Sequence, residues 1–156
     1  MHKELTTEQL SAALDRILAF RCDGVDPAEL NLRFCPTVES CDGPSRSAVF
    51  RFHTYRWMAN PMGLTHGGIV SAILDASMGT LCVAFYDVMT PTITMTTNYC
   101  RPVPLDSEVL VRVRVSYTGG TNAQMAAEMY LPDQPDDPLA TTSGVYYTAH
   151  VKHQQN

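Results

Sequence analysis

A histidine and two glycines, His66, Gly67 and Gly68, open an apolar segment that ends in a single carboxylate, Asp75. Glycines at the beginning of a helix leave backbone N–H groups uncovered, and the positive end of the helix dipole favours an oxyanion there. A carboxylate among isoleucine, valine, alanine and leucine occupies a position that is ordinarily apolar, because burying a charge costs free energy. Together these residues could supply an oxyanion donor and a general base or nucleophile, the two groups that acyl transfer requires.

The spacing between Gly67 and Asp75 decides how the two groups can cooperate. They are eight residues apart (75 − 67), which is about 12 Å along a helix that rises about 1.5 Å per residue. A base must reach hydrogen-bonding distance of the reacting centre, so one subunit cannot bring both groups to the same carbon. The sequence therefore predicts a dimer in which a two-fold axis pairs Gly67 of one subunit with Asp75 of the other.

Small residues share the helix face of Asp75 at spacings of three or four positions. They are Gly68, Ser71, Gly79 and Cys82. A slender acyl-pantetheine chain or another backbone could approach the carboxylate along this face. Close packing between helices explains the small residues alone equally well.

Two helices are predicted from apolar residues at helical spacing. The first covers residues 8–20, with Thr6 or Thr7 as its N-cap, and is amphipathic. The second begins near Gly67 and is apolar on almost every side, which predicts a core helix that is buried all round.

Segments that alternate in hydrophobicity, or that are rich in valine, threonine and tyrosine, are expected to be strands. The predicted strands are 33–40, 47–54, 92–100, 108–117, 122–131 and 139–151. The polar turn 133–138 divides two of these strands rather than two domains. Because strands and helices do not alternate regularly, the pattern predicts an α+β domain with a mainly antiparallel sheet curled around the second helix.

Length and composition are those of one globular domain, with 156 residues of which 45% are hydrophobic. A net charge of −5 without a cluster of lysine or arginine argues against a nucleic-acid partner. Five cysteines, an odd number without a C-x-x-C pair, favour reduced thiols over disulfides and give no support for zinc. No uninterrupted apolar run spans a membrane and the first residues do not form a signal peptide, so we expect a cytoplasmic protein without a membrane partner.

The segment around the glycine pair also carries a family resemblance. Residues 60–68 read N-P-M-G-L-T-H-G-G and are followed by Asp75. With the order of hairpin, buried helix and strand run, this motif resembles the hotdog-fold acyl-CoA thioesterases, and their phenylacetate-degradation (PaaI-like) branch in particular. The similarity extends with declining strength from about Leu32 to Tyr147, and residues 92–102, which end in Arg101-Pro102, also match the family. The resemblance implies a hotdog domain at residues 31–151, with residues 1–30 as an N-terminal helical flank and 152–156 as a polar tail.

The resemblance also implies roles for individual residues. The Gly67 N–H polarises the thioester carbonyl, and Asp75 acts as general base toward water or as nucleophile. Asn60 and His66 shape the positions of the carbonyl and the water. Thr92 matches a hydroxyl that relatives carry near the carboxylate. Each of the two shaping residues also has a structural explanation, since His66 can cap the helix and Asn60 can stabilise its turn.

Substrate contacts are expected from Gly68, Ser71 and Gly79 along the helix face and from Arg101, which could attract the diphosphate of CoA. Relatives often place a basic residue in the turn before the last strands, but residues 117–121 read Y-T-G-G-T. The usual contact to the CoA phosphates therefore lacks its residue in this turn.

The function implied by the resemblance is hydrolysis of a small or medium-chain acyl-CoA, aromatic acyl groups included, by a homodimer or by a homotetramer made of two dimers. Thiolate is a good leaving group, so one carboxylate and one oxyanion donor suffice without cofactor or metal. The sequence contains no G-x-S-x-G motif of a serine esterase. Two alternatives stay open: a noncatalytic acyl-CoA-binding hotdog protein, and a hotdog hydratase or dehydratase. The second needs a His/Asp or His/Glu pair for proton transfer, and the sequence near the helix does not show one.

Overall fold

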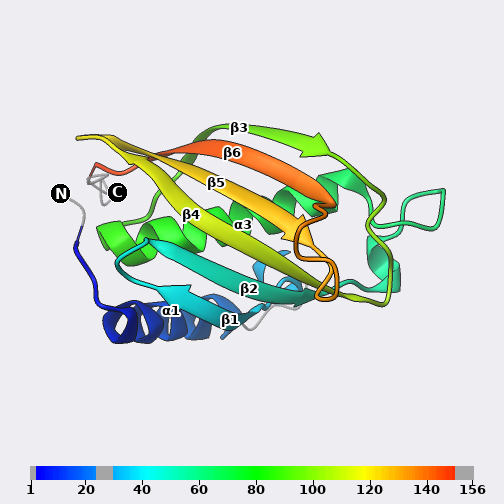
Figure 1. Cartoon of the computed structure of the whole chain (residues 1–156), viewed down its shortest axis with the longest axis horizontal. Coiled ribbons are helices and arrows are strands. Elements are labelled where there is room, and N and C mark those ends of the chain that lie inside the picture. Colours follow the sequence, from blue (N-terminus) through cyan, green and yellow to red (C-terminus); the bar gives the residue numbers. More distant parts are fainter. Residues whose placement is uncertain (1–2, 24–29, 150–156) are drawn as a thin grey trace, which may run out of the picture.

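The computed structural model describes residues 3–23 and 30–149, and Figure 1 shows one antiparallel sheet curved around one long helix. The strand order in the sheet is β1-β2-β4-β5-β6-β3. The strands are β1 (Thr37–Asp42), β2 (Ser47–His53), β3 (Thr92–Tyr99), β4 (Glu108–Thr118), β5 (Asn122–Tyr130) and β6 (Ala140–Tyr147). The helices are α1 (Thr7–Cys22), α2 (Leu30–Arg33), the 3-10 turn η1 (Arg56–Met58) and α3 (Gly67–Tyr86). This is the α+β hotdog fold that the sequence predicts.

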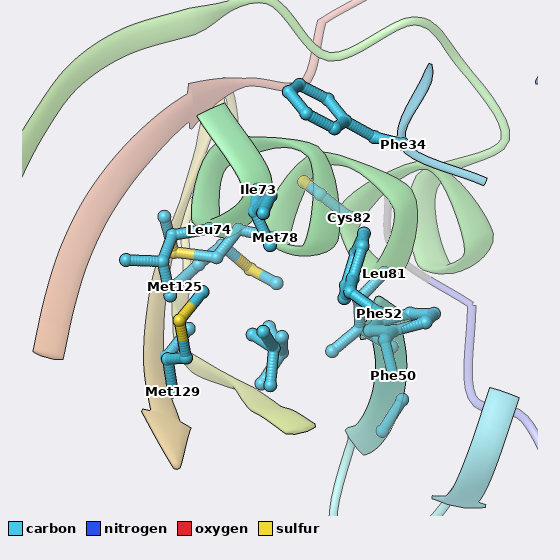
Figure 2. Packing of buried hydrophobic residues seen from close by; sticks show 14 of the residues in the cluster. Phe34, Phe50, Phe52, Ile73, Leu74, Met78, Leu81, Cys82, Met125 and Met129 are labelled. Carbon is cyan, nitrogen blue, oxygen red and sulfur yellow. The ribbon is translucent and has the colours of Figure 1, made fainter. Parts of the chain in front are cut away.

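The hydrophobic core lies between α3 and the concave face of the sheet. Strands present every second side chain to this face, and β2 and β5 supply large residues from it. Figure 2 shows these side chains around the helix, among them Phe50, Phe52, Ile73, Leu74, Met78, Leu81, Met125 and Met129. By length and composition α3 could also cross a membrane, but most of it is buried, as expected of the core helix of a globular domain.

The prediction that α3 is buried on all sides is wrong for one face of the helix. Gly68 is exposed, and Ser71, Asp75 and Gly79 are only partly buried, whereas Cys82 on the same face is fully buried. The sheet covers one side of the helix and α1 packs against another. The described residues cover the remaining side only in part, so a strip of small residues with the carboxylate in it stays partly accessible.

Helix α1 begins as the sequence predicts, with Thr6 as its N-cap. The Thr6 side chain accepts a hydrogen bond from the Gln9 backbone, and the Gln9 side chain accepts one from the Thr6 backbone. Its apolar side packs against α3 and β1 through Leu10, Leu14 and Leu18. The N-terminal helix is therefore attached to the core along the helix that carries Asp75.

The first predicted strand, residues 33–40, is wrong at its beginning. Residues Leu30–Arg33 form the short helix α2, and β1 starts only at Thr37. Pro36 has no backbone N–H to donate to a neighbouring strand, and Phe34 leaves the sheet direction to become buried in the core. The other five strands and both long helices lie within a few residues of their predicted ends in the part of the chain that the structure describes. The predicted polar tail, 152–156, lies outside that part.

Candidate functional site

Asp75 is held by two hydroxyl groups that donate to the same carboxylate oxygen. Thr92 Oγ1 lies 2.7 Å from Asp75 Oδ1, and the Tyr146 hydroxyl lies 2.8 Å from it. The Tyr146 hydroxyl is also 3.3 Å from the Asp75 backbone carbonyl. No described residue donates to the second carboxylate oxygen, Oδ2. The carboxylate is thus oriented by one oxygen and has the other available for a water molecule or a substrate.

Strand pairing explains why these two hydroxyls meet at the helix. Thr92 and Tyr146 are register partners on β3 and β6. Tyr146 is fully buried, and burial, followed by the negative charge of Asp75, raises the pKa of its phenol far above the usual value. The phenol therefore remains a hydrogen-bond donor at every pH at which the protein would work.

Tyr146 was missed from the sequence, although a signal for it exists. The residues of β6 that face the core alternate as Ala140, Thr142, Gly144 and Tyr146. A tyrosine at a core-facing position next to small residues needs a polar partner for its hydroxyl. The alternation of core-facing residues along β6 therefore predicts that Tyr146 points toward α3. It does not predict that Tyr146 lies opposite Asp75.

At the entry of α3, His66 caps the helix. Its Nδ1 accepts a hydrogen bond from the Gly68 N–H at 3.0 Å. The Gly67 N–H has no hydrogen-bond partner among the described residues. Of the two glycines, Gly67 is thus the one that offers a free donor. His66 has the predicted capping contact, and its role in orienting substrate stays a prediction.

Tyr99, at the end of β3, covers the first turn of the same helix. Its hydroxyl lies 2.6 Å from Ser71 Oγ and donates to the Gly67 carbonyl at 3.1 Å. The Ser71 hydroxyl is therefore engaged by Tyr99 at the first turn of the helix. Tyr99 has no signal in the sequence, because its contact depends on where the edge strand passes over the helix.

Asn60 organises the loop that leads into α3. Its Oδ1 accepts from the backbone N–H of Met62 at 2.8 Å and of Leu64 at 3.2 Å. Its backbone N–H donates to the Leu64 carbonyl at 2.7 Å. The side-chain amide group has no partner among the described residues and can donate to a ligand.

Arg101 is not brought to the carboxylate. It forms an ion pair with Asp137 at 2.5 Å and donates to Gln134 Oε1 at 3.3 Å. These contacts fasten the loop between β5 and β6. In this chain its guanidinium stabilises that loop, and the predicted contact to CoA stays a prediction.

A cavity of about 720 Å³ opens beside Asp75, and Gly79, Thr92 and Tyr146 are among its walls. A Cβ on Gly79 would lie 3.7 Å from the Tyr146 ring, an ordinary contact, so the glycine enlarges the cavity without being required by the backbone. The structure therefore collects the candidates into two groups. Asp75, Thr92 and Gly79 lie at the cavity, and His66, Gly67, Gly68 and Ser71 lie in the first turns of the helix. At about 1.5 Å per residue, Gly67 is about 12 Å and Ser71 about 6 Å from Asp75 along the axis.

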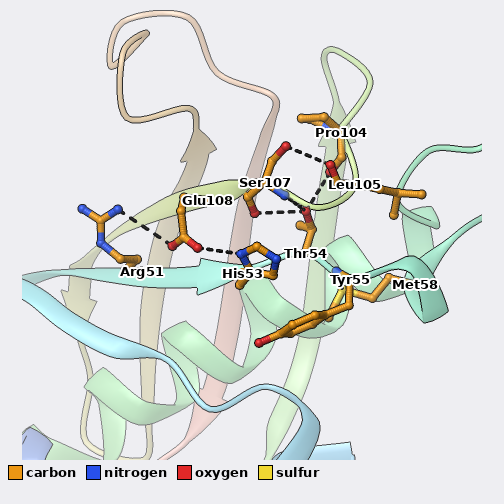
Figure 3. A network of polar contacts seen from close by, with 9 residues as sticks. All are labelled: Arg51, His53, Thr54, Tyr55, Met58, Pro104, Leu105, Ser107 and Glu108. Carbon is orange, nitrogen blue, oxygen red and sulfur yellow. Dashed lines mark hydrogen bonds and ion pairs between the residues drawn. The ribbon is translucent and has the colours of Figure 1, made fainter.

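A histidine–carboxylate pair lies elsewhere, at the end of β2 (Figure 3). His53 Nδ1 is 2.6 Å from Glu108 Oε1, and Arg51 Nη1 is 3.9 Å from Glu108 Oε2. Because Phe52 points into the core, its neighbour His53 points to the opposite, outer face of the sheet. Within residues 3–23 and 30–149 no three histidine, cysteine, aspartate or glutamate side chains are grouped as a metal ion would require.

Substituting valine for Thr92 is expected to lower any turnover that depends on Asp75 by about tenfold with little change in KM. Valine has the same shape and strand preference, but it removes a hydrogen bond to a charged group, worth about 1.5–3 kcal/mol. Steady-state kinetics would measure the change. Thr141→Val, on the outer face of β6, is the matched control, and an equal loss in both variants would contradict the role of Thr92.

The curved antiparallel sheet around a core helix defines a hotdog-fold domain. The free N–H at the first turn of that helix and the oriented carboxylate farther along it define a candidate acyl-transfer site. Residues 62–136 match the family model of the thioesterase superfamily. This match supports the predicted resemblance to the thioesterase superfamily, and the structural likenesses below confirm the hotdog fold. No curated protein sequence matches the chain.

Solved structures with the same fold are numerous, and three illustrate the likeness. The PaaI protein of the Escherichia coli phenylacetic acid degradation operon has a TM-score of 0.74 at 16% identity, covering 90% of this chain and 96% of that chain. A Ralstonia eutropha phenylacetic acid degradation-related protein, described as a thioesterase, has a TM-score of 0.71 at 20% identity, covering 86% and 98%. A Streptococcus pneumoniae protein described as a thioesterase, solved with coenzyme A, has a TM-score of 0.65 at 16% identity, covering 73% and 88%.

Proposed function

We propose that the protein is a cytoplasmic acyl-CoA thioesterase that hydrolyses small or medium-chain acyl-CoA, aromatic acyl groups included, to the free acid and CoA. The observation that carries the proposal is Asp75, a carboxylate with one oxygen fixed by two hydroxyls and the other free beside a cavity. The coenzyme A in the Streptococcus pneumoniae structure and the two structures related to phenylacetic acid degradation support the substrate class. The five cysteines form an odd set without a C-x-x-C pair, in keeping with a cytoplasmic protein.

In the proposed reaction, Asp75 Oδ2 takes a proton from a water molecule whose oxygen attacks the thioester carbonyl carbon. The negative charge that develops on the carbonyl oxygen is stabilised by the free Gly67 N–H of the other subunit. The carbon–sulfur bond then breaks, and CoA leaves as thiolate without help from an acid. Direct attack by the carboxylate, which forms an anhydride that water then hydrolyses, uses the same residues.

A homodimer is part of this proposal, because the two groups are too far apart within one chain. Two surfaces of the described residues are suited to a partner copy. One is the partly exposed face of α3 around Asp75. The other is β3, an edge strand that includes the exposed residues Ile93 and Tyr99. Further pairing into a tetramer is compatible with both surfaces.

The two alternative functions make different demands on the site. A hydratase needs a histidine–carboxylate pair for proton transfer next to the thioester. The pair His53–Glu108 lies on the outer face of the sheet, away from α3, and this placement favours hydrolysis. A noncatalytic acyl-CoA-binding protein would use the same cavity and would bind without turnover. Release of free thiol from a panel of acyl-CoAs by the purified protein tests the proposed function, and binding without release would overturn it.

Replacing Gly67 by proline is expected to lower kcat/KM by about 10²–10³-fold, the usual cost of removing one oxyanion donor. Proline lacks the N–H but fits the first position of a helix, and the extended backbone of His66 (φ −62°, ψ 134°) is compatible with a following proline. Gly67→Ala, whose Cβ would make an ordinary 3.4 Å contact with the Tyr99 ring, keeps the N–H and should lose much less. Equal losses in the two variants would contradict the donor role of Gly67.

A further inference from the structure

The cavity beside Asp75 is a groove that continues along α3 toward its C-terminal end. Asp75 stands at one end of the lining and Val83 stands at the other. Eight residues (83 − 75) correspond to about 12 Å at about 1.5 Å per residue. Carbon–carbon bonds of about 1.5 Å that zigzag at about 111° advance an extended chain by about 1.25 Å each, so an eight-carbon chain, about 9 Å long, fits within this length.

The floor and walls of the groove are suited to a slender apolar group. Its floor includes Ala76 and Gly79, which are small, so the space above the helix stays open. Helix α1 contributes Ile17 and Phe20 to one wall, and the segment before β3 contributes Met89 to the lining. The residues that line the groove come from α1, α3, the segment before β3, and strands β3 and β6 of one chain.

Two large apolar side chains at the groove are exposed to solvent. Phe20 is 82% exposed and Met89 is 69% exposed, although both line the cavity. Neither contributes to the hydrophobic core. Large apolar groups that stay in water beside a cavity are typical of a ligand-binding groove, because a bound apolar group removes them from water.

The wall formed by α1 is fastened to α3 one turn from the carboxylate. Arg21 Nη1 donates to the Ala76 carbonyl at 3.0 Å and also to Thr80 Oγ1. Burial lowers the pKa of this guanidinium, although arginine remains charged. Arg21 therefore fixes the distance between the two helices and with it the width of the groove.

We propose that this groove binds an unbranched medium-chain acyl group, with Phe20 and Met89 as residues that determine acyl-chain specificity. The inference rests on the proposed thioesterase function and assigns N-terminal helix α1 a role in substrate choice. An acyl chain whose carbonyl lies at Asp75 reaches the two exposed side chains only if it extends along α3. A phenylacetyl group would fill the part near Asp75 and Gly79 and leave the rest of the groove in water.

Hydrolysis of acetyl-, phenylacetyl- and octanoyl-CoA gives the first test. The wild-type protein should have its highest kcat/KM for octanoyl-CoA. Phe20→Ala and Met89→Ala should each lower the octanoyl-to-acetyl ratio of kcat/KM by about tenfold, since each removes apolar contacts with the distal part of the chain. Asp15→Ala, an exposed residue of α1 outside the groove, is the control and should leave the ratio unchanged. A preference for phenylacetyl-CoA, or a ratio that Phe20→Ala and Met89→Ala do not move, would overturn the groove proposal.

Binding separates failure of the groove from failure of the thioesterase function. Calorimetry with ketone analogues of octanoyl- and acetyl-CoA, in which a methylene replaces the thioester sulfur, needs no turnover. Tighter binding of the octanoyl analogue, weakened about tenfold by Phe20→Ala, supports the groove even if no acyl-CoA is hydrolysed. Equal binding of the two analogues would overturn the groove even if the protein is an active thioesterase.

Discussion

Replacing Asp75 with asparagine is expected to lower kcat for acyl-CoA hydrolysis by about 10²–10⁴-fold, with little change in KM. Asparagine has nearly the same shape, and its amide oxygen can accept the hydrogen bonds that Thr92 and Tyr146 donate to Oδ1. It has no basic oxygen in place of Oδ2. Proton abstraction from water and nucleophilic attack are therefore both lost, while the cavity keeps its form. Thiol release measured at several acyl-CoA concentrations separates the two kinetic constants.

A second carboxylate of the same helix provides the control for Asp75. Asp87 caps the C-terminal end of α3 with its backbone in the left-handed conformation, which asparagine adopts readily. Among the described residues, its ion-pair partner is Lys3, at 2.8 Å. That exposed ion pair contributes little to stability. Asp87→Asn should therefore keep wild-type kinetics. An Asp75→Asn protein that retained full turnover would exclude the carboxylate from the mechanism, whatever the control showed.

The sequence predicts most of the fold because its strongest signals are local. The apolar segment after Gly67 can only be a buried helix in a domain of this size, and the strands after Pro91 are separated by turn residues. The error at residues 33–40 has a tertiary cause. Phe34 is drawn into the core, and Pro36 cannot join a ladder, so the alternating pattern starts before the strand does.

The candidate site is only partly predictable for a related reason. Thr92 was expected near Asp75 because family resemblance places a hydroxyl there, and the structure brings the two side chains to 2.7 Å. The second donor, Tyr146, depends on the register between β3 and β6, which joins residues more than fifty positions apart (146 − 92). Pairing over such a distance has no local signal.

The exposed face of α3 differs from its prediction in an informative way. Composition alone suggested burial on every side, whereas a single chain covers only part of the helix. The accessible strip is the one that contains Asp75. The helix sequence is apolar on all sides, but the fold of one chain leaves one side open. A second copy that covers this side would explain the difference. The distance between Gly67 and Asp75 requires the same arrangement.

Mixing two inactive variants is expected to restore activity if the site is shared between subunits. Gly67→Pro removes the oxyanion donor and Asp75→Asn removes the base. In a mixed dimer, the donor of the Asp75→Asn chain meets the carboxylate of the Gly67→Pro chain, so one site is intact and the other lacks both groups. Random exchange makes about half of the dimers mixed, and half of their sites work, which gives about a quarter of wild-type activity.

The restored activity distinguishes a shared site from a site within one chain. If Gly67 and Asp75 of the same chain acted together, every chain in the mixture would carry one defect and no site would be complete. Subunits can be exchanged in mild denaturant and returned to buffer, and two different affinity tags allow purification of the mixed dimers. These purified dimers should then have about half of wild-type activity, with each variant alone near zero. Mixed dimers as inactive as their parents would disprove the shared site, whereas activity that rises with the fraction of mixed dimers can come only from groups on two different chains.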